Sequence, residues 1–202
     1  MQGEIAELIE VGRRLHLRGW LPASSGNLSA KLGEGRVLIT ASGVHKGHLT
    51  CEDFVVVDWQ GRQVEGSGKP SAETLLHLAV YRSLPQVGSV LHVHSVSSTL
   101  LSRLAQGDVK LENYELLKAF GIGTHEACVR VPVFENSQDM RELSQQVEQR
   151  LKQEQVYGFL LRSHGLYAWG RSVEEAYMRL EALEFLLECE LRLALSLKYP
   201  HA

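Results

Sequence analysis

Four short strand-like runs follow one another in the first third of the chain, and tight turns join the first pair and the last pair. The runs span residues 27–32, 37–40, 54–59 and 63–65. Gly-Glu-Gly and Gln-Gly-Arg connect the first pair and the last pair, and short Gly-containing connections of this kind are typical of hairpins. We therefore expect a meander of antiparallel strands, which limits the fold to one with a largely antiparallel sheet.

Helical patterns surround this meander. Apolar spacing predicts helices over 4–18, 71–84, 96–104, 112–120 and 137–152, and strands over 89–94, 128–134, 156–162 and 166–169. Ser172 and Glu175 form a capping-box pattern that begins a long final helix. With 202 residues, 44% of them apolar, and no linker, the sequence predicts one domain over 1–202. The class is α/β or α+β, with a central sheet flanked by helices.

Charge and cysteine usage exclude several kinds of protein. The net charge is −3 and no basic run is present, so we expect neither a nucleic acid nor a membrane as partner. Three widely spaced cysteines and an acidic N-terminal segment unlike a secretory signal predict a reduced, cytoplasmic protein. The uncharged stretch 83–102 is too rich in Ser and His for a membrane span.

Nine histidines are many for a chain of this length. His92 and His94 lie two apart in a predicted strand, so their rings project from the same face, and paired neutral imidazoles are typical zinc ligands. His164, followed by Gly165, is the best third ligand, although a turn histidine in a hairpin explains it equally well. His77, one helical turn after Glu73, is expected to form an exposed pair with it.

Two loops of small residues resemble anion sites. Residues 24–27 and 41–46 offer backbone N–H groups and hydroxyls, and Lys46 adds an ammonium group, which together suit a phosphate monoester. Ser71 precedes a predicted helix and can supply another contact. Each loop alone is no more than a turn, whereas the loops together with a metal pair indicate a site.

Five motifs then occur in an order and spacing that resemble the class II aldolase family, zinc-dependent enzymes that act on sugar phosphates. They are Gly26-Asn27-Leu28-Ser29, Ser42-Gly43, Pro70-Ser71-Ala72-Glu73, His92-Val93-His94-Ser95 and Ser163-His164-Gly165. The resemblance covers nearly the whole chain. Segments 111–118, 131–136 and 162–170 look most like the family's dehydratases of methionine salvage.

The resemblance implies a three-layer αβα fold, and a homotetramer with sites near subunit interfaces. It implies that His92, His94 and His164 hold one Zn²⁺ per subunit, and that Glu115 is the catalytic acid and base. The implied phosphate contacts are Gly26, Asn27, Ser42, Gly43, Lys46 and Ser71.

Three functions remain open at this point. Glu73 stands where the family's aldolases carry their catalytic glutamate, so it is the alternative base. An aldolase or 4-epimerase acting on fuculose, rhamnulose or ribulose phosphate is therefore the nearest alternative to a dehydratase. A non-catalytic, adducin-like interaction domain is a third reading, and the intact set of three histidines argues against it.

Overall fold

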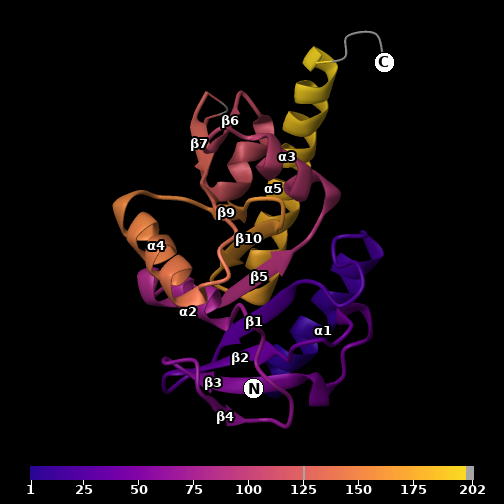
Figure 1. Ribbon diagram of the computed structural model, residues 1–202, viewed down its shortest axis with the longest axis vertical. Coiled ribbons are helices and arrows are strands. Elements are labelled where there is room, and N and C mark those ends of the chain that lie inside the picture. Colours follow the sequence, from indigo (N-terminus) through magenta and orange to yellow (C-terminus); the bar gives the residue numbers. More distant parts are fainter. Residues whose placement is uncertain (125, 199–202) are drawn as a thin grey trace.

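The computed structural model describes residues 1–124 and 126–198. An eight-stranded sheet runs through its centre (Figure 1), and its neighbouring strands are antiparallel except for the last pair, which is parallel. The order of the strands is β4 (Gln63–Glu65), β3 (Phe54–Asp58), β2 (Arg36–Thr40), β1 (Asn27–Lys31), β5 (Ser89–Val93), β10 (Gly165–Gly170), β9 (Gly158–Leu161) and β8 (Val133–Phe134). The predicted antiparallel meander is thereby confirmed as β1 to β4.

Helices cover both faces of this sheet. One face carries α1 (Gln2–Leu17), α3 (Val96–Leu104) and α5 (Val173–Lys198), and the other carries α2 (Thr74–Ser83) and α4 (Met140–Gln153). The central strands alternate accordingly, since Leu91 packs towards α5 while Val90 packs towards α2 and α4. The three-layer α/β fold is confirmed.

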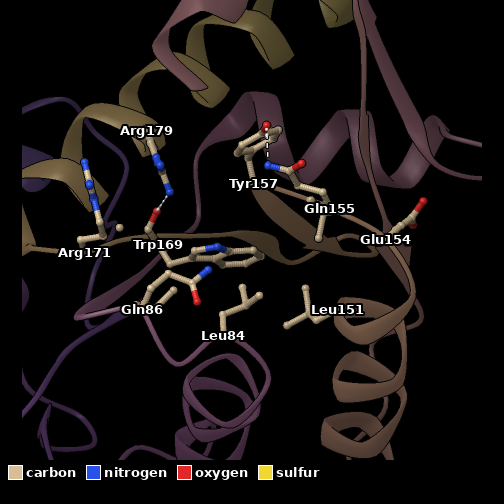
Figure 2. A pocket seen from close by; sticks show the side chains of 12 residues that line it. Leu84, Gln86, Leu151, Glu154, Gln155, Tyr157, Trp169, Arg171 and Arg179 are labelled. Atoms are coloured by element: carbon tan, nitrogen blue, oxygen red, sulfur yellow. Dashed lines mark hydrogen bonds between the residues drawn. The ribbon is translucent and has the colours of Figure 1, made fainter. Parts of the chain in front are cut away.

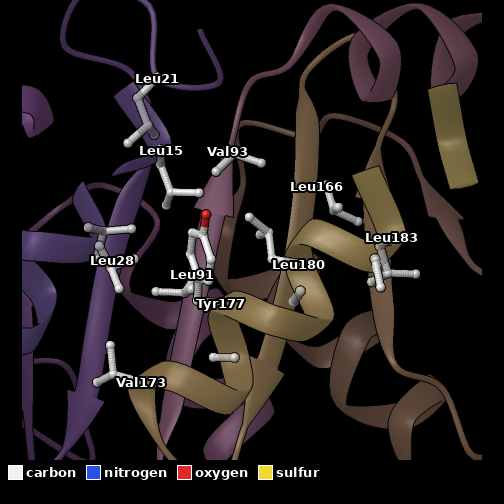
Figure 3. Close-up of a cluster of buried hydrophobic side chains, with 14 of the residues drawn as sticks. Leu15, Leu21, Leu28, Leu91, Val93, Leu166, Val173, Tyr177, Leu180 and Leu183 are labelled. Atoms are coloured by element: carbon white, nitrogen blue, oxygen red, sulfur yellow. The ribbon is translucent and has the colours of Figure 1, made fainter. Parts of the chain in front are cut away.

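The long final helix anchors the first of these faces. Figure 3 shows apolar side chains of the sheet meeting those of α5; they are Leu91, Val93, Leu166, Tyr177, Leu180 and Leu183. The Ser172 hydroxyl accepts the backbone N–H of Glu175, and the Glu175 carboxylate accepts the backbone N–H of Arg171. This variant of the predicted capping box gives hydrogen-bond acceptors to two backbone N–H groups that would otherwise have none at the start of the helix.

Two predicted elements were wrong. The region 112–120 is not one helix, because β6 (Val109–Glu112) precedes a short 3₁₀ helix, η3 (Glu115–Phe120). Asn113 adopts a positive φ of 61°, which ends the strand and keeps the two elements separate.

The region 128–134 is likewise not one strand. β7 (Cys128–Val131) pairs with β6 in a separate two-stranded sheet, whereas β8 joins the main sheet. Pro132 lies between them, and its missing N–H interrupts the ladder.

Smaller differences concern the loops and the element ends. The stretch between β2 and β3 contains two 3₁₀ turns, η1 (Lys46–His48) and η2 (Cys51–Asp53). The helix predicted from residue 71 begins at Thr74, so Ser71 and Glu73 lie in the turn before it. In the part of the chain that the structure describes, no helix combines the length and the apolar character needed to cross a bilayer.

Candidate metal and sugar-phosphate site

Three histidine side chains converge at one end of the central strands. His92 lies on β5, His94 follows the end of that strand, and His164 lies in the turn between β9 and β10. Their Nε2 atoms are 2.9 Å (92 to 94), 3.3 Å (92 to 164) and 3.1 Å (94 to 164) apart. Ligands at about 2.0–2.1 Å from a tetrahedral zinc ion are separated by roughly 3.3 Å, so the three nitrogens fit one metal ion.

The fold fixes the direction of two of these rings. Nδ1 of His92 donates to the Leu166 carbonyl at 3.0 Å, and Nδ1 of His164 donates to Oδ1 of Asn136 at 3.1 Å. Because a neutral imidazole carries one proton, each Nε2 keeps its lone pair for a metal. Gly165 allows this approach, since a Cβ there would collide with the carbonyl of β5 that faces it.

Burial favours the neutral form of two of these imidazoles, His92 and His94. It lowers the pKa of His92 well below its usual value, and the nearby rings of His94 and His164 lower it further. Burial, followed by the effect of His164, lowers the pKa of His94 to about 4. The Tyr167 ring stacks on His92 with centroids 3.9 Å apart. Three imidazole nitrogens held this close together suit a divalent metal ion such as zinc, and these three residues form the group that could hold one.

Glu73 lies at the same centre. Its Oε1 is 3.1 Å from Nε2 of His164, and its Oε2 is 3.3 Å from Nε2 of His92. Nδ2 of Asn27 donates to Oε2 at 2.6 Å. The structure therefore places the alternative carboxylate beside the candidate metal ligands of its own chain.

A buried hydrogen-bond chain holds Asn27 in this orientation. Its Oδ1 accepts from Nε2 of His77, and Nδ1 of His77 lies 2.7 Å from the Ser29 hydroxyl, which also contacts the Tyr81 hydroxyl at 2.7 Å. The expected exposed pair of His77 with Glu73 is wrong, because the His77 side chain is completely buried and burial lowers its pKa to about 4. The apolar spacing of α2 predicted a helix with one buried face, but the sequence did not indicate that His77 lies on that face.

A pocket of about 260 Å³ opens beside the metal ligands. It is lined by all six residues expected to bind phosphate, which are Gly26, Asn27, Ser42, Gly43, Lys46 and Ser71. Glu73, His94 and His164 also line it, whereas His92 is fully buried behind it. Sequence motifs that lie far apart along the chain thus meet in one cavity.

The phosphate end of this pocket is built around Lys46. Its Nζ donates to the carbonyls of Ser24 at 2.6 Å and Val44 at 2.9 Å, which leaves one N–H for a ligand. Burial lowers the pKa of Lys46 to about 8, against the opposing effect of Glu73. Gly43 has a φ of +79° and open space where a Cβ would stand, so its backbone is accessible to an anion.

Other lining residues were not among the six expected phosphate contacts, although Ser25 belongs to the predicted anion loop 24–27. The Ser25 hydroxyl is buried and has no hydrogen-bond partner among the described residues, and it lies in the wall of the pocket. Asn136 and Gln138 enter from the loop after β8. The sequence of segment 131–136 indicated only a resemblance to the family. No spacing pattern predicted that the side-chain amide of Asn136 would orient His164.

Glu115 does not line this pocket. It begins η3, where its side chain is 73% exposed and forms an ion pair with Lys118. The structure thus brings together every expected site residue except Glu115.

A larger cavity of about 370 Å³ lies elsewhere (Figure 2). Its wall includes Trp169 and Leu84. Its charged residues are engaged in ion pairs, Arg179 with Glu175 and Glu154 with Arg150. No histidine of the described chain lines it, so it lacks candidate metal ligands, and the candidate site is the pocket beside the three histidines.

With this fold and site described, the chain can be assigned to a class. Residues 6–191 match the family described as Class II Aldolase and Adducin N-terminal domain, and the chain belongs to that family. It is 53% identical over 190 residues to methylthioribulose-1-phosphate dehydratase of Methylococcus capsulatus, covering 93% of each chain. It is 52% identical over 202 residues to the enzyme of the same name from Xanthomonas campestris pv. campestris, covering 98% of this chain and 92% of the relative.

Solved structures agree with this assignment. L-fuculose-1-phosphate aldolase from Thermus thermophilus superposes with a TM-score of 0.77 at 28% identity, covering 96% of each chain.

Proposed function

We propose that this protein is a hydro-lyase that converts 5-methylthioribulose 1-phosphate into 2,3-diketo-5-methylthiopentyl 1-phosphate, a step of methionine salvage. The observation that carries the proposal is 53% identity over 93% of the chain to a dehydratase of that name, combined with three convergent histidine nitrogens. About half of the residues are shared along nearly the full length, so the likeness extends well beyond the metal motif.

We assign zinc to the cluster formed by His92, His94 and His164. Bound there, a zinc ion would act as a Lewis acid on the C2 carbonyl and C3 hydroxyl oxygens and so acidify the C3 hydrogen. The chain contributes the geometry, because Leu166 and Asn136 set the direction of two of the three rings. No reorganisation of those rings is then needed when substrate binds.

The phosphate loops have a positioning role in this proposal. Lys46 lines the pocket with two N–H groups held by carbonyls, so its third is available to a phosphate oxygen and its charge neutralises part of the phosphate charge. Ser42, Gly43 and Ser71 line the same wall and offer hydroxyl and backbone donors. Held at the phosphate, the substrate presents C3 and C4 at a fixed distance from the metal ligands.

Proton transfer is assigned to Glu115. Its carboxylate accepts the hydrogen of C3 as a proton and delivers it to the C4 hydroxyl oxygen, which leaves as water. The resulting enol becomes the 2,3-diketone by proton transfer to C4. Because Glu115 lies outside the pocket of its own chain, we propose that it serves the pocket of a neighbouring subunit.

A homotetramer is part of this proposal. Exposed apolar side chains support it, since α3 presents Val96, Leu100 and Leu104 at four-residue intervals and α5 presents Phe185 and Leu193. Several exposed apolar side chains on helices that pack together are typical of a subunit interface. Leu116 of η3, next to Glu115, is also partly exposed, so burying this region would order the glutamate.

An aldolase remains the second candidate function. Glu73 contacts the same histidines in the position of the family's aldolase glutamate, and the fold matches an L-fuculose-1-phosphate aldolase. With Glu73 as base, the C3–C4 bond would break instead of the C4–O bond. An interaction domain without catalysis is disfavoured, because such a domain has no need of three converging imidazoles.

The test is product analysis with zinc-loaded protein and 5-methylthioribulose 1-phosphate. The proposal predicts a diketone with the mass of the substrate minus one water. An aldehyde together with a phosphorylated three-carbon ketone would instead identify an aldolase. Metal-depleted protein is the control, and its activity should return when zinc is added back.

A further inference from the structure

We propose that Glu184, buried in α5 outside the pocket, is a positioning residue that holds His94 and His164 in metal-binding geometry through the N-terminal turn of α3. The inference rests on the proposed metal-dependent function. Glu184 contacts neither the pocket nor the substrate loops, so its effect is transmitted through Ser95 and the helix that Ser95 caps.

His94 needs this support more than the other two ligands. Nδ1 of His92 and Nδ1 of His164 each have a hydrogen-bond acceptor, whereas no partner for Nδ1 of His94 occurs among the hydrogen bonds of residues 1–124 and 126–198. The orientation of His94 therefore depends on the backbone at each side. Its own N–H donates to the Trp20 carbonyl at 2.9 Å, and the next residue is Ser95.

Ser95 is fixed by Glu184. The Ser95 hydroxyl donates to Oε2 of Glu184 and accepts the backbone N–H of Ser98 at 2.9 Å, which caps α3. The Ser98 hydroxyl lies 2.8 Å from the Ser95 hydroxyl. The carboxylate thus fixes the hydroxyl that begins the helix directly after a metal ligand.

The same helix holds the third ligand. Thr99 Oγ1 donates to the His164 carbonyl at 2.8 Å, and the Ser102 hydroxyl accepts the backbone N–H of Ser163 at 3.1 Å. Ser163 itself has a positive φ of 56°, which a non-glycine residue keeps only when its surroundings hold it. One helix, α3, therefore connects the backbone at His94 with the turn that carries His164.

A glutamate at this position carries an energetic cost that packing does not explain. Its side chain is 2% exposed among apolar neighbours on α5 such as Leu180 and Leu187. Its Oε1 has no hydrogen-bond partner among the described residues. Burial raises the pKa of Glu184 to about 7, against the lowering effect of hydrogen bonds from Ser95 and Ser98. An apolar residue would avoid this cost. We therefore attribute the presence of the Glu184 carboxyl to its hydrogen bond with the Ser95 hydroxyl, which it holds in place.

The experiment compares Glu184→Ala with Glu184→Gln, which keeps an acceptor for Ser95. Glu188→Ala, one turn further along α5 and paired with Arg192 on the surface, is the matched control. Zinc dissociation constants are measured by chelator competition, and the cobalt-substituted proteins are compared by visible absorption, which reports ligand geometry. Thermal unfolding of the metal-free proteins measures any general loss of stability.

Glu184→Ala should weaken zinc binding by roughly 10–100-fold and alter the cobalt spectrum, while Glu184→Gln and Glu188→Ala stay within about threefold of wild type. Zinc affinity of Glu184→Ala within that same margin would overturn the inference. If Glu184→Ala does not fold, Thr99→Val removes the link to the His164 carbonyl and is measured in the same way, with the same two outcomes. Wild-type protein that binds no metal would instead contradict the proposed function, so the two failures are distinguishable.

Discussion

Glu73 and Glu115, the two glutamates that could move protons, lie in opposite kinds of surroundings. The Glu73 side chain is 13% exposed, accepts a hydrogen bond from Asn27 and faces the metal ligands. The Glu115 side chain is 73% exposed and forms a surface ion pair with Lys118. Exposed ion pairs of this kind hold a side chain only weakly, typically by less than about 1 kcal/mol.

The difference shows which part of the site one chain can build alone. The region around Glu73 is ordered by strand pairing and a buried hydrogen-bond chain, so a single subunit suffices. The Glu115 carboxylate, by contrast, does not line the pocket of its own chain. Under the proposed function, the two regions form one site when a second chain brings Glu115 to the pocket.

The largest expected effect comes from removing a metal ligand. His92→Ala deletes a fully buried imidazole, and two remaining ligands hold zinc far less well than three. We expect both bound metal and turnover to fall below detection, measured by metal analysis and by diketone formation. Turnover by a metal-free His92→Ala protein would disprove metal dependence.

The next effect separates the two glutamates. Glu115→Gln removes the group assigned to proton transfer and should lower kcat by roughly 10²–10⁴-fold, while zinc content stays at the wild-type level because Glu115 is remote from the ligands. Glu73→Gln is the companion variant, measured for kcat and zinc content together. A Glu115→Gln enzyme with wild-type kcat would move the base to Glu73.

A smaller effect probes the region that one chain builds alone. His77→Leu leaves the buried Asn27 amide oxygen unpaired, a loss of about 1–3 kcal/mol, and lets the amide turn away from Glu73. We expect kcat/KM to fall roughly 10–100-fold, with zinc retained. Arg82→Ala, on the exposed side of the same helix, is the control and should match wild type.

The smallest effect is a pH dependence. Lys46 has a pKa of about 8, so its ammonium is present below pH 8 and is lost as the pH rises above that value. kcat/KM, which reports the free enzyme, should therefore fall about tenfold per pH unit above pH 8. Lys46→Arg keeps its charge throughout, so its profile should be flat there, and a parallel decline in both proteins would exclude Lys46 as the cause.

Local patterns predicted a central, largely antiparallel sheet flanked by helices, whereas the family resemblance supplied the three-layer arrangement and the list of expected site residues. His92 lies on a strand as expected and His94 follows directly after the strand's last residue, Val93, and the small-residue loops line the pocket. What could not be predicted depends on distant contacts. The orienting role of Asn136 and the burial of His77 arise only when segments far apart in the chain pack together, whereas the break at Pro132 had a local signal in the proline itself.

Glu115 differs from these cases. Its expected role came from the family resemblance, and in the structure it begins η3, outside the pocket of its own chain. Its role as acid and base stays a prediction that concerns an assembly of chains.

Mixing two inactive variants tests that prediction most directly. Glu115→Gln subunits keep an intact metal pocket and His92→Ala subunits keep an intact Glu115, so mixed oligomers contain sites with both. If Glu115 serves a neighbouring pocket, equal mixing with subunit exchange should restore about one quarter of wild-type diketone formation. Mixed oligomers that form, as shown by native mass spectrometry, yet stay inactive would contradict the account.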